Sequence, residues 1–178
     1  RIMNEKRKID VVVKYFLPVM AGIEVNTSET YHFLAQKSWD VTFHATRDTH
    51  IQKDVLPEKE TIMGLKVLRY PFGIFGFFPK IDWEKADLVC LHNFNVVPHF
   101  FIMLRTLLFK LLRQKKYALI LTPHGGFNPE WRIFSPPVAL IKKLYHFTLG
   151  VWLINRSVDG VRAVSEWERR EMITRGIS

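Results

Sequence analysis

Residues 117–126 read YALILTPHGG, an almost unbroken apolar run that ends in a polar, glycine-bearing loop. Such a run is typical of a strand that is covered on both faces in a parallel sheet. Similar β-rich runs, each bounded by turn or cap residues, recur along the chain. They predict strands at residues 9–15, 40–46, 86–92, 117–122 and 159–164.

Helical patterns lie between these runs. Asn26 with Glu29 resembles a capping box, which predicts a helix from there to about Gln36. Ser165 with Glu168 predicts the cap of a final helix. The other predicted elements are helices at 97–116 and 136–154, a strand near 62–69 and a mobile, charged stretch at about 49–60. Strands that alternate with helices predict an α/β fold with a Rossmann-like, doubly wound parallel sheet, in one domain over residues 1–178.

The composition fits a globular domain with a full core. The chain has 178 residues, 48% of them apolar, with nine Gly, nine Pro and one Cys. These values exclude intrinsic disorder, collagen and a disulfide-stapled scaffold. The apolar stretches are shorter than a membrane span requires. We therefore expect a cytoplasmic protein, with a peripheral position at the inner face of the membrane as the alternative.

The net charge of +9 is unevenly distributed. Residues 88–158 carry nine basic side chains and one acidic side chain, Glu130, whereas the flanking parts are close to neutral. This excess predicts an anionic partner, for which three kinds are open: a phosphate-bearing ligand, an acidic lipid or a nucleic acid. Specific nucleic-acid recognition is not expected, because no known reading motif accompanies the charge.

Polar and glycine residues follow the predicted strands directly. Gly22 and Glu24 come after the first strand, His92 and Asn93 end the third, and His124 follows the fourth. In a doubly wound sheet the carboxyl ends of the strands meet at one edge, where ligands bind. The loops therefore predict a single site at that edge.

Four motifs occur in one order along the chain. They read PVMAGIE at 18–24, ADLVCLHN at 86–93, TPHG at 122–125 and VRAVSE at 161–166, with Gly176 and Ile177 closing the set. Together they resemble the N-terminal half of glycosyltransferase family 4, the retaining, nucleotide-sugar-dependent enzymes of the GT-B fold. Two positions depart from that pattern. Ala21 stands where the family has the first of two glycines, and Cys90 where many members have the first of two histidines.

The resemblance implies a role for each loop residue. His124 is the catalytic candidate, which orients the transferred sugar by hydrogen bonds rather than acting as a general base; the alternative is a histidine that satisfies local carbonyls. Gly22 is implied to approach the donor's phosphate, and the alternative is a glycine needed only for a tight turn. The implied acceptor-binding residues, for which a structural role is the alternative, are Glu24, His92, Asn93 and Gly125.

The resemblance also implies the partners. The donor is expected to be a nucleotide-diphosphate sugar, and the acceptor a glycan or a lipid-linked molecule. A C-terminal nucleotide-sugar domain is expected to be missing from these 178 residues, so that they form half of a cleft and are inactive alone. No metal is expected, because the histidines lack metal-ligand spacing and Cys90 is the one cysteine.

A membrane contact is predicted from the basic residues of the helix expected at 97–116. At 100° per residue they gather in one sector together with apolar residues, which suits a helix on an anionic lipid surface. The candidates for this contact are Arg105, Phe109, Lys110, Arg113 and Lys116. The apolar loop at 72–78 is a second candidate. The alternatives are a solvated helix face, a loop folded over the core and, for the whole protein, a basic Rossmann-like module that binds anionic membrane or nucleic acid without catalysis.

Overall fold

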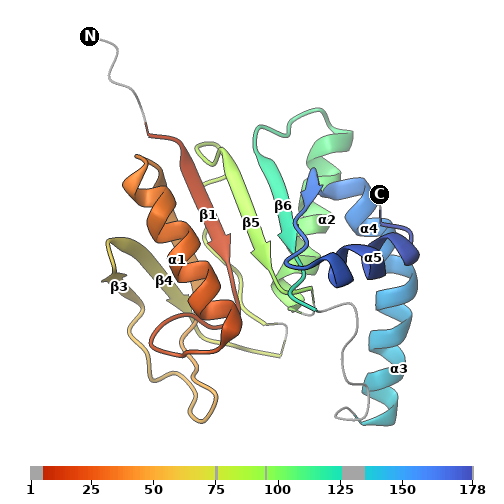
Figure 1. Ribbon diagram of the computed structural model, residues 1–178, viewed down its shortest axis with the longest axis horizontal. Coiled ribbons are helices and arrows are strands. Elements are labelled where there is room, and N and C mark those ends of the chain that lie inside the picture. Colours follow the sequence, from red (N-terminus) through yellow and green to blue (C-terminus); the bar gives the residue numbers. More distant parts are fainter. Residues whose placement is uncertain (1–5, 75, 95, 126–134, 178) are drawn as a thin grey trace.

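The computed structural model describes residues 6–74, 76–94, 96–125 and 135–177. Within these ranges, seven strands form one sheet in the order β3-β4-β2-β1-β5-β6-β7 (Figure 1). Neighbouring strands are parallel except for the antiparallel pair β3 and β4. The predicted α/β fold with a Rossmann-like sheet is therefore confirmed. Phe75, Gly126 and Glu130, which belong to the apolar loop at 72–78, the run at 117–126 and the charge argument, lie outside the described residues.

The predicted strands are mostly present. Their bounds are β1 (Lys8–Val12), β2 (Asp40–Thr46), β3 (Lys59–Ile62), β4 (Leu65–Tyr70), β5 (Leu88–His92), β6 (Ala118–Thr122) and β7 (Gly160–Val161). The predictions for β1 and β7 were too long. The strand predicted near 62–69 is in fact a hairpin of β3 and β4. Met63 and Gly64 have φ angles of 53° and 78°, and such a pair forms the two-residue turn that joins antiparallel strands.

The helices lie between the strands and after the last one. They are α1 (Gly22–Gln36), α2 (Val97–Leu111), α3 (Pro136–Leu144), the π-helical turn η2 (Tyr145–Leu149), α4 (Gly150–Ser157) and α5 (Glu166–Thr174). The long helix predicted at 136–154 corresponds to the continuous run from α3 to α4. The predicted cap of α5 is confirmed, because the Ser165 hydroxyl accepts from the Glu168 N–H at 3.1 Å.

The predicted start of the first helix is wrong. α1 begins at Gly22, so Asn26 lies inside the helix and caps nothing. The polar residues of this segment are satisfied within the helix instead. The Thr27 hydroxyl donates to the Ile23 carbonyl at 2.8 Å, and Ser28 bonds a carbonyl of the preceding turn in the same way. A capping-box pattern therefore marked the first turns of α1 but not its first residue.

The predicted end of the second helix is also wrong. α2 ends at Leu111, because Arg113 adopts a left-handed conformation with φ of 57°. The Gln114 N–H donates to the Phe109 carbonyl at 2.8 Å, and the Arg113 N–H bonds another carbonyl of the last turn at 3.1 Å. These two bonds form a Schellman motif, which satisfies the last carbonyls of a helix and closes it. Arg113 and Lys116 therefore lie beyond the helix, and the basic helical sector expected from their spacing does not form.

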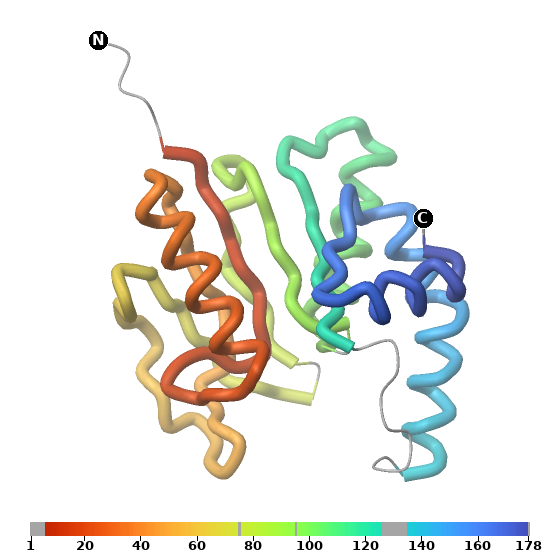
Figure 2. The backbone as a smooth tube through the Cα atoms, viewed as in Figure 1, coloured from red at the N-terminus to blue at the C-terminus, as the bar shows by residue number. Residues whose placement is uncertain are grey.

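The two faces of the sheet carry separate cores. Val11 packs in the layer that contains Tyr31 of α1, whereas its neighbour Val12 packs in the layer that contains Met103 of α2 and Leu153 of α4. This alternation arises because successive residues of a strand point to opposite faces. Figure 2 shows α1 in front of the sheet and α2 behind it. The layers bring the carboxyl ends of β1, β5 and β6 to one edge, the lower edge in Figure 1.

Candidate functional site

A pocket of about 510 Å³ lies at the edge where β1, β5 and β6 end. The predicted site residues among its lining are Gly22, Glu24, His92, Asn93 and His124. The loops after three different strands therefore meet in one place, and Val164 adds the segment after β7. Gly125 is not part of the lining.

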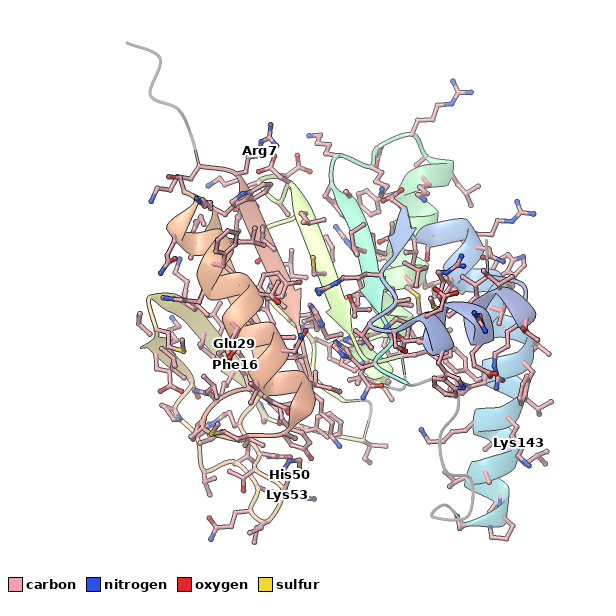
Figure 3. All side chains as sticks on the ribbon, viewed as in Figure 1. Arg7, Phe16, Glu29, His50, Lys53 and Lys143 are labelled. Atoms are coloured by element: carbon pink, nitrogen blue, oxygen red, sulfur yellow. The ribbon has the colours of Figure 1, made fainter. Side chains whose placement is uncertain are left out.

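Among the lining residues that were not predicted, three have polar side chains. Lys14 and Tyr15 follow β1, and His50 follows β2. Figure 3 shows His50 at this same edge of the molecule. Lys14 contributes a positive charge to the pocket. No motif marked these residues, and Lys14 and Tyr15 lay inside the strand predicted at 9–15, which in fact ends at Val12.

A tyrosine and two histidines form a hydrogen-bonded chain at the pocket. Tyr31 Oη lies 2.8 Å from His92 Nε2, and His92 Nδ1 lies 2.8 Å from His124 Nε2. His92 is buried and His124 is half-buried. Both ring nitrogens of His92 are thus engaged within the protein, so His92 supports the ring of His124 from behind. Tyr31 was not predicted, and only its position on the buried face of α1 connects it with the site.

Burial keeps both histidines neutral. It is the main cause that lowers the pKa of His92 well below its usual value, and charge repulsion from His124, His99 and Arg162 lowers it further. Burial also lowers the pKa of His124; the charge of Arg162 acts in the same direction and that of Glu168 in the opposite one. A neutral imidazole has one donor and one acceptor nitrogen. When the Tyr31 hydroxyl donates to His92 Nε2, His92 donates through Nδ1 to His124, whose own proton is then on Nδ1.

The loop that carries His124 has a specific backbone shape. His124 and Gly125 have φ angles of 51° and 75°, both in the left-handed region, which is uncommon for a residue with a side chain. The Gly125 N–H donates to the buried carboxylate of Glu168, which also accepts from the Val164 N–H at 2.8 Å. Glu168 was predicted only as the partner of Ser165 in a capping box. Its carboxylate instead ties the His124 loop to the start of α5.

Gly22 begins α1 at the pocket. Ala21 is the N-cap residue and makes no side-chain hydrogen bond, so no capping side chain covers the first N–H groups of the helix. Gly22 has no positive φ, and a Cβ built on it would meet no atom within 4 Å. The alternative of a glycine required by a tight turn is therefore not supported. Open space beside a helix N-terminus suits the approach of a phosphate.

Glu24 and Asn93 are held beside this helix start. Glu24 is buried in the first turn of α1, and its Oε2 has no hydrogen-bond partner within the part of the chain that the structure describes. Asn93 has a φ of 76°, and its N–H donates to the Thr122 carbonyl at 2.9 Å. A buried carboxylate oxygen without a partner is costly.

The sequence profile of Glycosyltransferase Family 4 matches residues 20–178 of this chain. The chain belongs to this family. The matched region includes both histidines of the hydrogen-bonded chain, the Gly22 helix start and Glu168. No curated protein is similar enough to this family 4 chain to count as a relative.

Three of the basic residues that were predicted to contact a membrane, Arg105, Lys110 and Lys116, contact other groups of this family 4 domain. The Arg105 guanidinium lies 4.6 Å from the centre of the Trp83 ring and 4.3 Å from that of Phe109, as in cation–π contacts. Lys110 forms an ion pair at 3.0 Å, and Lys116 pairs with a surface glutamate. The contact of these residues with a membrane stays a prediction.

The apolar loop at 72–78 has side chains in the core and side chains at the surface. Phe77 is buried, whereas Ile74 and Phe78 are exposed to 95% and 60%.

No helix among the described residues is both long and apolar enough to cross a membrane. The same residues contain no cluster of three or more His, Cys, Asp or Glu side chains that could hold a metal ion.

Proposed function

We propose that this glycosyltransferase family 4 protein transfers a sugar from a nucleotide-diphosphate sugar to a glycan or lipid-linked acceptor, with retention at the anomeric carbon. Membership of the family supports a transferase. One observation carries the finer proposal: the start of α1 at Gly22 and the ring of His124 line the same pocket. The first can hold a diphosphate and the second can orient a sugar. In this proposal the chain builds the acceptor side of a cleft, and a second domain binds most of the nucleotide.

The phosphate side of the proposed site is positively charged. The N-terminus of α1 carries the positive end of the helix dipole, and Lys14 lines the same pocket. Arg162 lies close enough to lower the pKa of both histidines. Negative charge develops on the diphosphate as the bond from the anomeric carbon to the phosphate oxygen breaks. Positive groups that are already in place stabilise that charge.

His124 is proposed to position the sugar. Its ring is neutral, so it can donate one hydrogen bond to a sugar hydroxyl while its Nε2 remains joined to His92. The proposed transfer is a front-face one, in which the acceptor oxygen attacks from the side on which the phosphate leaves. The bond from the acceptor oxygen to the anomeric carbon forms as the bond to the phosphate breaks, and the leaving phosphate takes the acceptor proton. No general base is then needed.

Glu24 is proposed to bind the acceptor. Glu24 lines the pocket together with the His124 ring, and a carboxylate accepts a hydrogen bond from a hydroxyl group. Asn93 lines the same pocket and offers both donor and acceptor groups. His92 is proposed as a positioning residue for His124, because it is buried and its two nitrogens bond within the protein.

The proposal is tested with the full natural protein and a panel of nucleotide sugars. Transfer or slow hydrolysis of one donor identifies the nucleotide, and the anomeric configuration of the product reports retention. His124→Ala is expected to lower turnover by about 10²-fold or more, with little change in the unfolding midpoint. His32→Ala, at a half-buried histidine of α1 that does not line the pocket, is the matched control. Wild-type turnover in His124→Ala would remove that residue from the site.

A further inference from the structure

An apolar groove of about 670 Å³ lies between the start of α2 and the run from α3 to η2. Its walls include Phe100 and Phe101 of α2 and Val138, Ile141 and Leu144 of α3. The volume lies within the range of pockets that bind small ligands. Its lining side chains are mainly aliphatic and aromatic, so a sugar or a peptide backbone would find few hydrogen-bond partners there.

α3 leaves this groove open. None of its residues is buried, although most of them are apolar. Figure 1 shows that α3 extends beyond the edge of the sheet at which the candidate site lies. Leu140, Ile141 and Leu144 are exposed to 59%, 67% and 57%. Exposed apolar area on this scale marks a surface that binds an apolar partner.

The groove adjoins the candidate site. Asn93 lines the site pocket, and the next residue, Phe94, lines the groove. Each of the two cavities also contains a lysine: Lys14 lines the site pocket, and Lys142 lines the groove. Burial lowers the pKa of Lys142, and repulsion from the charge of Lys14 lowers it further.

We propose that this groove holds the hydrocarbon chain of an anionic amphiphilic acceptor, with its phosphate or other anionic group at Lys142 and Lys14 and its sugar-accepting end in the His124 pocket. This inference rests on the proposed transfer and names the acceptor class. The chemistry of the groove and its mouth selects such a molecule: an apolar channel takes the chain, and two cations take the charge next to it. The basic excess of residues 88–158, which include Lys142, agrees with an anionic occupant.

The first experiment titrates the full natural protein with alkyl phosphates of increasing length, each below its micelle concentration. Affinity is expected to rise by up to about fourfold per methylene until the groove is full. Inorganic phosphate and uncharged alcohols of the same length are expected to bind much more weakly, because each supplies only half of the ligand. Equal affinity for all chain lengths would overturn the proposal.

Matched variants on α3 locate the binding. Ile141→Ser removes a groove wall, and Leu140→Ser changes an exposed neighbour that does not line the groove. Ile141→Ser is expected to weaken binding of decyl phosphate about tenfold, whereas Leu140→Ser leaves it unchanged. Lys142→Gln should reduce the preference for the phosphate over the alcohol, with Lys143→Gln as its control; Figure 3 shows Lys143 projecting from α3. Equal loss of binding in Ile141→Ser and Leu140→Ser, or equal loss of phosphate preference in Lys142→Gln and Lys143→Gln, would overturn the assignment.

Two outcomes distinguish this inference from the proposed function. Sugar transfer to a water-soluble glycan without chain-length-dependent binding would overturn the groove alone. Absence of transfer to any acceptor, with chain binding intact, would overturn the proposed function alone. Dimers, or another part of the natural protein, that close the groove and abolish binding of the alkyl phosphates would also overturn the lipid assignment.

Discussion

His92 Nδ1 lies 2.8 Å from His124 Nε2, and the other nitrogen of the buried His92 ring is 2.8 Å from the Tyr31 hydroxyl. The ring of the catalytic candidate is thus fixed by two residues that come from β5 and α1. Neither of these elements carries His124 itself, whose loop follows β6. The orientation of His124 therefore depends on the packing of the sheet against α1 as well as on its own loop.

The first prediction concerns His92 as a positioning residue. His92→Phe removes the Nδ1 partner of His124 and is expected to lower kcat by about tenfold to 10²-fold, because the His124 ring loses its orientation. His92→Asn, whose amide can donate from nearly the same place, should recover part of that loss. The measurement is kcat and KM in the full natural protein, alongside the unfolding midpoint. Equal kcat in the Phe and Asn variants would contradict the positioning role.

The second prediction concerns Gly22. Gly22→Ala is expected to fold normally, because the added Cβ would meet no atom within 4 Å and alanine favours a helix. The methyl group would, however, occupy the space proposed for the donor diphosphate, and donor affinity should fall about tenfold. Calorimetric titration with the donor that supports transfer measures this change.

Gly150→Ala is the comparison for Gly22→Ala. Its Cβ would lie 2.6 Å from the Phe94 ring and 2.7 Å from the Tyr145 carbonyl, so this variant should lose stability. If Gly22→Ala binds the donor as tightly as the wild type, the phosphate does not approach this residue.

The third prediction concerns Glu168. The two carboxylate oxygens of Glu168 accept from the Gly125 and Val164 N–H groups, one each. Glu168→Gln keeps only one of these accepting oxygens and places an amide donor in a buried position. The free energy of unfolding should fall by about 1–3 kcal/mol, and turnover should fall as well, because the same contact holds the His124 loop. Urea unfolding and kcat are measured together. Glu166→Gln, on the exposed side of the same helix start, should change neither quantity much. Identical behaviour of the two variants would contradict this role of Glu168.

The fourth prediction is a loss of stability in mild acid. His99 is fully buried, and burial lowers its pKa from 6.5 to about 4. Between these values the unfolded chain binds a proton that the folded chain does not, so the folded state loses stability as pH falls. The contribution is complete above about pH 6.5, and about 3 kcal/mol of it is lost by pH 4.

Urea unfolding at pH 7.5 and pH 5 checks this prediction. His99→Phe should weaken the dependence of unfolding free energy on pH, although buried His92 leaves a dependence of the same sign. His50→Gln, at an exposed histidine, should leave the dependence as in the wild type. Stability that does not change between the two pH values would contradict the burial of neutral histidines.

The sheet could be predicted from the sequence because the apolar pattern of a buried strand lies in neighbouring residues. An apolar run such as that of β6 must be covered on both faces wherever it occurs, and the polar loop after it must lie at the sheet edge. The predictions were wrong where one local sequence pattern is compatible with more than one backbone conformation. The residues after Leu111 were expected to continue the helix, but a left-handed Arg113 closes it with a Schellman motif.

The same limit applied to the candidate site. Spacing placed His92 and His124 at the ends of neighbouring strands, but it gave no sign that one ring would support the other. Tyr31 was not predicted as a site residue, because a tyrosine on the inner face of a helix is typical of a core residue. Glu168 fitted a capping box so well that its bond to the Gly125 N–H was not expected.

The sequence by itself determined the class of fold, the edge of the sheet at which the site lies and the family to which the motifs belong. These follow from periodicity and from the order of motifs, which are properties of neighbouring residues. Tertiary structure alone decided that Tyr31, His92 and His124 form one hydrogen-bonded chain and that Lys142 lines an apolar groove between α2 and α3. Such contacts join residues far apart in the chain, and only the packing of helices on the twisted sheet brings them within hydrogen-bonding distance.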